Sequence, residues 1–367
     1  MTCAHRERRA AGGAAAGASG DGGLSSIMDV VADARIVHTE GRLSARRGRT
    51  RAGSGGEMTG AYDWLAVDWR NSRLRVWAMA DGAVVDAREA PSGATRLAGP
   101  PAFAAAFAAL VEDWTPAHRP AAVVICGMAG AREGWHPAAY AAHDGDLREL
   151  PEAAVRVPDG DAAFDIRILP GLRQAEPPDV MRGEETKLLG LVAETPDAGG
   201  VFVLPGTHSK WVQLARGRVA RFRTAMTGEI FDAVAEHSLL RHTLGGSGDD
   251  EWDAADFAAA VAEGRDAPAA LPRRAFGLRA EAILNGLAPD LARARLSGWL
   301  TGLEVADALE QFGQPSRVTL VGEPDQLERY AAALAVFGVA SDRRDGGTLA
   351  RAGLVLAHDR LFGGARA

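Results

Sequence analysis

Cysteine is nearly absent from the 367 residues, because only Cys3 and Cys126 occur. This scarcity excludes a disulfide framework and a cysteine-rich zinc site, and it fits a reducing compartment. No apolar run reaches the roughly 18 residues that cross a bilayer, and the arginine-rich start lacks the apolar segment of a secretion signal. We therefore expect a cytoplasmic protein with no membrane partner.

An excess of positive over negative charge is absent beyond the first residues. The formal net charge is −7, and residues 1–57 hold nine arginines against six acidic residues, so they carry +3 and the remainder carries −10. A nucleic-acid surface needs clustered positive charge, so no nucleic-acid partner is expected. Lysine in particular is rare, because the chain contains only Lys187 and Lys210.

The length exceeds one ordinary core of roughly 100 to 200 residues, which predicts two domains. Residues 1–57 are rich in Ala, Gly, Arg and Ser with little periodicity, so we interpret them as a disordered extension or an artefact of an upstream start. The folded part is expected to form an N-terminal lobe at 61–195 and a C-terminal lobe at 199–362, with a cleft between them.

Two patterns of strand, polar turn and strand occur, at 64–77 and at 201–213. Such a turn presents backbone N–H groups and short hydroxyls at one point, which suits a phosphate. Asp68 ends the first strand, where a carboxylate can hold Mg²⁺ through water. Two facing turns would clamp a triphosphate, whereas one alone is also explained as an ordinary turn between strands.

Between these patterns, Gly183 precedes Glu184 and Glu185 at the start of a predicted helix. A kinase needs a carboxylate that accepts the proton of the attacking hydroxyl. Acidic residues in a first helical turn are equally well explained by their favourable interaction with the helix N-terminus. The pattern leaves both interpretations open.

The remaining periodicity predicts an α/β protein whose second half is rich in helices. Strands are expected at 83–85, 121–126 and 317–321, and helices at 101–114, 230–240, 253–263, 291–312 and 325–337.

Five segments resemble the 2-dehydro-3-deoxygalactonokinase family, and they occur in the order of that family: Val67–Trp69, Gly127–Gly130, Met181–Thr186, Leu204–Val212 and Phe222–Glu229. The resemblance covers essentially Ala61 to the C-terminus. It implies an α/β fold of the two-lobed, actin-like ATPase type (ribonuclease H-like) with a central cleft. It also implies transfer of phosphate from ATP, with Mg²⁺, to the 6-hydroxyl of 2-dehydro-3-deoxy-D-galactonate in galactonate catabolism.

The resemblance further implies roles for individual residues. Glu184 is the expected catalytic base, Glu185 is the alternative, and Asp68 is the expected metal ligand. Expected ATP contacts come from Asp68, Asn71, Ser72, Gly206, Thr207, His208, Lys210, Gly322 and Glu323. Expected contacts to the sugar acid come from Arg96, Gly130, Arg132, Glu133 and Arg182, because arginine can grip a carboxylate with two hydrogen bonds.

One position departs from the family pattern. Arg70 follows Asp-Trp where the family has glycine. Its side chain either crowds the phosphate that a glycine would let approach or supplies positive charge to it.

Other functions stay open at this level. A kinase for another sugar or sugar acid is the first alternative, since a fold does not determine a substrate. A sugar-acid or nucleotide binding protein without catalysis is the second. A nicotinamide-dependent dehydrogenase is disfavoured because no Gly-x-Gly-x-x-Gly follows the first strand. Whether the chain forms a homodimer is not determined by the sequence.

Overall fold

The computed structural model describes residues 61–158, 162–245 and 253–363. The extension predicted at 1–57 lies outside the described residues. The strands are β1 (Trp64–Trp69), β2 (Leu74–Ala80), β3 (Ala83–Ala90), β4 (Ala121–Gly127), β5 (Tyr140–Ala142), β6 (Val155–Arg156), β7 (Phe164–Ile168), β8 (Gly171–Gln174), β9 (Asp179–Met181), β10 (Gly200–Leu204), β11 (Ser209–Ala215), β12 (Arg218–Ala225), β13 (Arg317–Gly322) and β14 (Ala340–Asp345). The α-helices are α2 (Pro100–Val111), α3 (Glu184–Glu194), α4 (Thr227–His237), α5 (Arg241–Leu244), α6 (Ala254–Asp266), α7 (Leu271–Asn285), α8 (Pro289–Gln311), α9 (Pro324–Val336) and α10 (Gly346–Phe362).

The first sheet has the strand order β3-β2-β1-β4-β7-β6. β1 is antiparallel to β2, which is antiparallel to β3, while β1, β4 and β7 run parallel. The Asp81-Gly82 turn has positive φ at both residues and joins β2 to β3, as tight hairpin turns require. The predicted three-strand meander is therefore confirmed.

The second sheet repeats this design with the order β12-β11-β10-β13-β14. Three antiparallel strands are again extended by two parallel strands on the side of the first strand. Apart from β6, which lies antiparallel at the edge of the first sheet, the two sheets have the same order and strand directions. This is the duplicated pattern of the actin-like fold, so the predicted fold class is confirmed. A small third sheet, β5-β8-β9, was not predicted.

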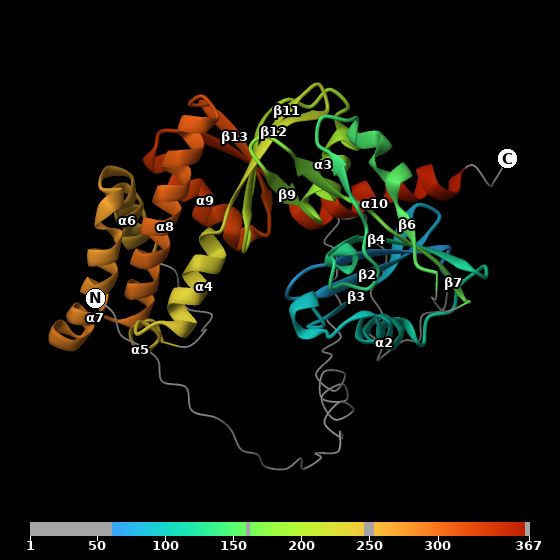
Figure 1. Cartoon of the computed structure of the whole chain (residues 1–367), viewed down its shortest axis with the longest axis horizontal. Helices are drawn as coiled ribbons and strands as arrows, with labels where there is room; N and C mark the ends of the chain where they lie inside the picture. The colour runs from blue at the N-terminus through green and yellow to red at the C-terminus, as the bar shows by residue number, and fades with distance from the viewer. Residues whose placement is uncertain (1–60, 159–161, 246–252, 364–367) are drawn as a thin grey trace, which may run out of the picture.

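Side chains of β1 alternate between two cores, as the period of a strand requires. Leu65 and Val67 pack with residues of α2, whereas Trp64 and Ala66 pack with residues of α3 and α10. In Figure 1, α3 and α10 lie between the two sheets. α10 contacts α3, β1 and β4, although the sequence places it in the C-terminal lobe.

The crossing of α3 and α10 depends on two glycines. A Cβ atom on Gly190 would lie 1.9 Å from the carbonyl oxygen of Leu349, and one on Gly353 would lie 2.0 Å from that of Thr186. These distances are far below van der Waals contact, so the two helix backbones touch directly.

Helices α6, α7 and α8 of the second half pack together at the end of the molecule away from the first sheet (Figure 1). Leu278, Leu296 and Trp299 are among the buried residues that α7 and α8 contribute there. The expected helices correspond to α2, α4, α6, α8 and α9. In the part of the chain that the structure describes, no helix is both long and apolar enough to cross a membrane.

Candidate active site

The first polar turn, between β1 and β2, is held by backbone hydrogen bonds. The N–H of Arg70 donates to the carbonyl of Arg73 at 2.9 Å, which closes the turn. The carbonyl of Asn71 accepts from the backbone N–H of Thr95 at 3.2 Å and from its hydroxyl at 2.9 Å. The segment after β3 therefore braces this turn from behind.

The second polar turn, between β10 and β11, is braced by the start of α4. The N–H of Glu229 donates to the carbonyl of Thr207 at 3.0 Å, and the Glu229 carboxylate also pairs with the His208 ring. Lys210 Nζ donates to the carbonyl of His208 at 2.7 Å. These bonds fix the backbone of the turn.

The start of α3 lies against the ends of β1 and β4. Gly127 has φ of 88° and Gly183 has φ of 105°, a region that favours glycine. A Cβ on Gly127 would lie 2.3 Å from the carbonyl oxygen of Trp69, and one on Gly183 would lie 3.3 Å from Gly127 Cα. The carboxyl ends of two parallel strands and a helix N-terminus thus converge, which is where α/β sheets bind ligands.

A cleft of about 300 Å³ opens at this point between the two turns. It brings together eleven of the predicted residues, namely Asp68, Asn71, Ser72, Arg182, Glu184, Gly206, Thr207, His208, Lys210, Gly322 and Glu323. Lys187 and Lys210, the two lysines of the chain, both line it.

Glu184 faces this cleft from the first turn of α3. Its Oε1 lies 3.0 Å from Lys210 Nζ, and its Oε2 accepts from the backbone N–H of Arg182 at 3.1 Å. Burial alone would raise the pKa of Glu184, but Lys210 and Lys187 outweigh it and lower that pKa. Glu184 is therefore an ionised carboxylate at neutral pH.

Glu185, the alternative base, points away from the cleft. Its side chain is buried, and its two oxygens lie 2.8 and 2.7 Å from the backbone nitrogen of Gly183. Burial, together with the charge of Glu184, raises the pKa of Glu185 to about 8. At neutral pH Glu185 is therefore mostly protonated, beneath the floor of the cleft.

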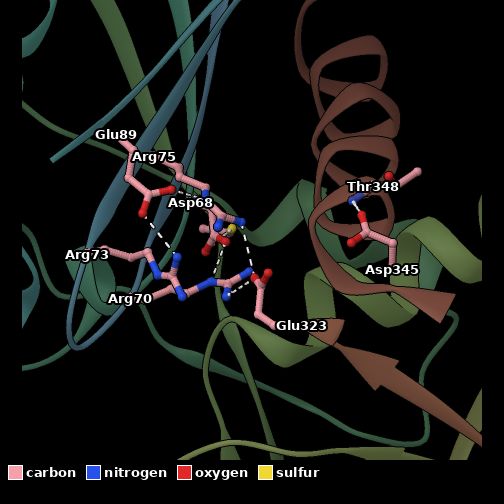
Figure 2. Close-up of polar contacts among 9 residues, drawn as sticks. Asp68, Arg70, Arg73, Arg75, Glu89, Glu323, Asp345 and Thr348 are labelled. Carbon is pink, nitrogen blue, oxygen red and sulfur yellow. Dashed lines mark hydrogen bonds and ion pairs between the residues drawn. The ribbon is translucent and has the colours of Figure 1, made fainter. Parts of the chain in front are cut away.

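Arg70 joins the two sides of the cleft (Figure 2). Its Nε donates to Asp68 Oδ2 at 2.7 Å, and its Nη1 donates to Glu323 Oε1 at 2.8 Å. Arg75 Nη1 donates to the same oxygen of Glu323 at 3.2 Å and its Nε donates to Glu89. Burial would lower the pKa of Arg70, but Asp68 and Glu323 outweigh it and raise that pKa. The guanidinium thus stays charged and neutralises two carboxylates.

Arg182 forms a second cationic feature. Its Nη2 donates to the carbonyl of Ala138 at 2.7 Å, and its guanidinium carbon lies 4.2 Å from the centre of the Tyr140 ring. A Cβ on Gly130 would lie 2.6 Å from Nη1 of Arg182, and this Nη1 is buried without a hydrogen-bond partner in the described part of the chain. Gly130 and Arg182 are therefore neighbours, as a shared substrate site would require.

The other residues predicted to contact the sugar acid lie elsewhere. Arg96, Arg132 and Glu133 are exposed and do not line the cleft. Arg96 and Arg132 were predicted because arginine can grip a carboxylate, and the Arg132–Glu133 pair because of the resemblance. None of these side chains lines the cleft.

A second pocket of about 340 Å³ adjoins the cleft, and both are lined by Pro205, Gly206, Thr207 and Gln326. Sequence patterns did not predict the pocket residues that α4, α8 and α9 contribute, because these helices show only amphipathic periodicity. They include Thr227, Asp232, Asp290, Arg293, Ser297, Thr301, Arg329 and Tyr330. Of the pocket residues on these helices, Thr227 and Gly228 fell in a segment singled out by sequence, Phe222–Glu229.

A buried network lies behind the second turn. Glu304 accepts hydrogen bonds from Trp211 Nε1 at 2.8 Å and from Tyr330 Oη at 2.9 Å, and the Tyr330 hydroxyl also bonds the Ser209 hydroxyl at 2.6 Å. Burial raises the pKa of Glu304. The network connects α8 and α9, which line the second pocket, to the first residue of β11.

The residues of the cleft suit a Mg²⁺ ion that binds together with the phosphates of a nucleotide. No group of three His, Cys, Asp or Glu side chains among the described residues could hold a metal by itself. Mg²⁺ typically needs only one or two carboxylates, because water and phosphate oxygens complete its shell. Asp68 supplies one such carboxylate at the cleft.

The duplicated sheets, the paired polar turns and the carboxylate between them define the class of actin-like phosphotransferases. The model of the 2-keto-3-deoxy-galactonokinase family matches residues 68–357. A protein of Rhizobium meliloti (strain 1021) assigned as 2-dehydro-3-deoxygalactonokinase is 42% identical over 300 residues, which are 81% of this chain and 97% of the relative. The 2-dehydro-3-deoxygalactonokinase of Escherichia coli (strain K12) is 35% identical over 81% of this chain and 97% of its own length.

A crystal structure of a Sinorhizobium meliloti protein, also assigned as 2-dehydro-3-deoxygalactonokinase, superimposes with a TM-score of 0.72 at 42% identity and covers 82% of this chain and 99% of that one. The chain therefore belongs to the 2-keto-3-deoxy-galactonokinase family.

Proposed function

We propose that the protein transfers the γ-phosphate of ATP to the 6-hydroxyl of 2-dehydro-3-deoxy-D-galactonate, as a cytoplasmic enzyme of galactonate catabolism. The observation that carries the proposal is Glu184, an ionised carboxylate facing a cleft framed by two polar turns. Two lobes, 61–195 and 199–362, would close over the substrates and exclude water.

ATP would lie across both cavities. The turns at Asn71-Ser72 and Gly206-Thr207 would hold its phosphates, and the adjoining pocket, which shares Gln326 with the cleft, would take adenosine. Asp68 would hold Mg²⁺, which supplies charge neutralisation to the phosphates when bound. The pocket volume of about 340 Å³ lies within the range of small-molecule sites.

The sugar acid would be oriented by Arg182. Its side chain is fixed by Ala138 and Tyr140, and its Nη1 is buried with no partner among the described residues. A substrate carboxylate would satisfy this donor with a charge-assisted hydrogen bond. This contact would set the acid end of the substrate and point its far hydroxyl toward the phosphates.

Glu184 would accept the proton of that hydroxyl as its oxygen attacks the γ-phosphorus and the bond to the ADP oxygen breaks. The transition state of phosphoryl transfer is loose, so positioning matters more than strong basicity. The lowered pKa of Glu184 is compatible with this role, because the carboxylate is available at neutral pH. Lys210 keeps the Glu184 carboxylate oriented, because its Nζ lies 3.0 Å from Glu184 Oε1.

The test is Mg²⁺-dependent ATP consumption with a panel of sugar acids that includes the galactonate derivative and its gluconate epimer. We expect Glu184→Gln to lower turnover by about 10² to 10⁴, the usual contribution of a general base. Glu194→Gln, on the exposed end of the same helix, is the matched control and should leave turnover unchanged. Equal turnover in both variants would assign the base elsewhere, and preference for another acid would favour a different sugar-acid kinase.

A further inference from the structure

We propose that Arg70 is a phosphate-binding residue that changes partners. In the structure it joins Asp68 to Glu323, and when ATP binds its guanidinium passes to the terminal phosphates. This inference rests on the proposed function, and it assigns a role to a side chain that bridges the two sides of the cleft.

The two partners of Arg70 come from opposite sides of the cleft. Asp68 is the last residue but one of β1 in the first sheet, whereas Glu323 follows β13 of the second sheet and precedes α9. Figure 2 shows the guanidinium between the two carboxylates. One side chain therefore bridges residues that are 255 positions apart and that both line the cleft.

Arg70 and Mg²⁺ would compete for the same carboxylate. Nε of Arg70 lies 2.7 Å from Asp68 Oδ2, and the Asp68 side chain is only 5% exposed. A carboxylate so enclosed has little room for a second cation, and Mg²⁺ prefers oxygen ligands of this kind. Arg70 must therefore leave Asp68 before Asp68 can serve Mg²⁺.

The charges around Arg70 allow that departure. Glu323 keeps a cationic partner, because Arg75 Nη1 already lies 3.2 Å from the same oxygen that Arg70 contacts. Asp68 would receive Mg²⁺, and the guanidinium would receive phosphate oxygens. Once Mg²⁺ is bound, each of these carboxylates again has a cationic partner, so the completed exchange avoids the cost of an uncompensated buried charge.

An unused donor of Arg70 also points to phosphate oxygens as the new partners of its guanidinium. Nη2 of Arg70 is buried and has no hydrogen-bond partner in the described ranges. Arg70 shares the cleft with Gly206 and Thr207 of the second turn, where the phosphates are expected. A guanidinium matches the geometry of phosphate oxygens and bonds them with two donors at once.

The inference predicts opposite effects of one substitution on two affinities. Calorimetric titration without Mg²⁺ would measure the affinity for ATP alone. A second titration would measure the Mg²⁺ concentration at which ATP binding is half-maximal. Arg70→Gly should weaken metal-free ATP binding by about 10- to 100-fold, the range for a charge-assisted hydrogen bond. The same variant should need several-fold less Mg²⁺, because Asp68 is no longer occupied by a competing cation.

Two further variants complete the experiment. Arg70→Lys keeps the positive charge but loses the paired N–H donors of the guanidinium. Its affinity for metal-free ATP should therefore fall between those of the wild type and Arg70→Gly. This variant also decides the outcome if Arg70→Gly does not fold, since an unchanged affinity would overturn the inference. Arg156→Ala removes an arginine whose side chain is 62% exposed on β6 and should change neither affinity.

The remaining outcomes separate the inference from the proposed function. If the wild type binds and consumes ATP but Arg70→Gly behaves identically, Arg70 has no phosphate role and the kinase assignment stands. If Arg70→Gly binds metal-free ATP more tightly, Arg70 obstructs the site and the inference is overturned. If the wild type neither binds nor consumes ATP, the proposed function itself fails and the inference fails with it.

Discussion

Replacing Glu185 by Gln should change the pH dependence of stability. Glu185 is buried, and its pKa is raised from 4.5 to about 8. The native state therefore holds a proton that the unfolded chain releases between these values. The stabilising contribution of this proton is fully present below about pH 4.5 and is lost as the pH rises through about 8.

The magnitude follows from the shift. One pKa unit corresponds to 1.36 kcal/mol, so a rise from 4.5 to about 8 corresponds to about 5 kcal/mol as an upper figure. Gln at 185 does not titrate, and its carbonyl can still accept from the N–H of Gly183. The free energy of unfolding of Glu185→Gln minus that of the wild type should thus increase between pH 4.5 and 8 by up to this amount.

Urea unfolding at intervals of one pH unit from 5 to 8 would measure the difference. Glu194→Gln is the matched control, because Glu194 lies on the same helix with a side chain 39% exposed. Its difference from the wild type should be nearly constant with pH. A constant difference for Glu185→Gln as well would refute the conclusion that a buried proton sits beneath the cleft.

Two other substitutions test the substrate site and the packing between the sheets. Arg182→Lys should raise the KM for the sugar acid by about 10-fold while leaving the KM for ATP unchanged, because an ammonium cannot keep the contacts to Ala138 and Tyr140 and also present a donor at the place of Nη1. Initial rates with both substrates varied would measure this, and an equal rise in both constants would contradict it. Gly353→Ala should destabilise the fold by about 1 to 3 kcal/mol, because its Cβ would lie 2.0 Å from the Thr186 carbonyl. The control is Gly277→Ala on α7, where no atom lies within 4 Å of the added carbon. This variant should be neutral or stabilising by up to about 1 kcal/mol. Thermal unfolding would measure both glycine variants. Equal effects of the two glycine substitutions would contradict the packing at the crossing.

Local sequence patterns predicted the parts of the fold that depend on neighbouring residues. The two hairpins were predicted because polar turns separate apolar or alternating segments, and both form. β14 was missed because Ala340–Asp345 is polar and mostly exposed at the edge of its sheet. An edge strand of that kind carries no hydrophobic alternation.

The candidate site was predictable where its residues lie in turns and helix starts. Two carboxylates in sequence could not be separated by pattern, and only packing directs Glu184 to the cleft and Glu185 to the interior. The partner of Arg70 could not be predicted either, since Glu323 is 253 residues away and meets it through the arrangement of two sheets. The adjoining pocket was missed for the same reason, because three helices distant in sequence form it.

The crossing of α3 and α10 has a consequence for how this family can vary. α3 begins at Glu184, and α10 begins at Gly346, where an added Cβ would lie 3.0 Å from Gly322 beside the proposed nucleotide site. A larger residue at Gly190 or Gly353 would push the two helices apart and shift both of their starts at once. Neither glycine touches the cleft, yet we expect these two positions to change together among related chains, because each substitution requires an adjustment of the facing backbone.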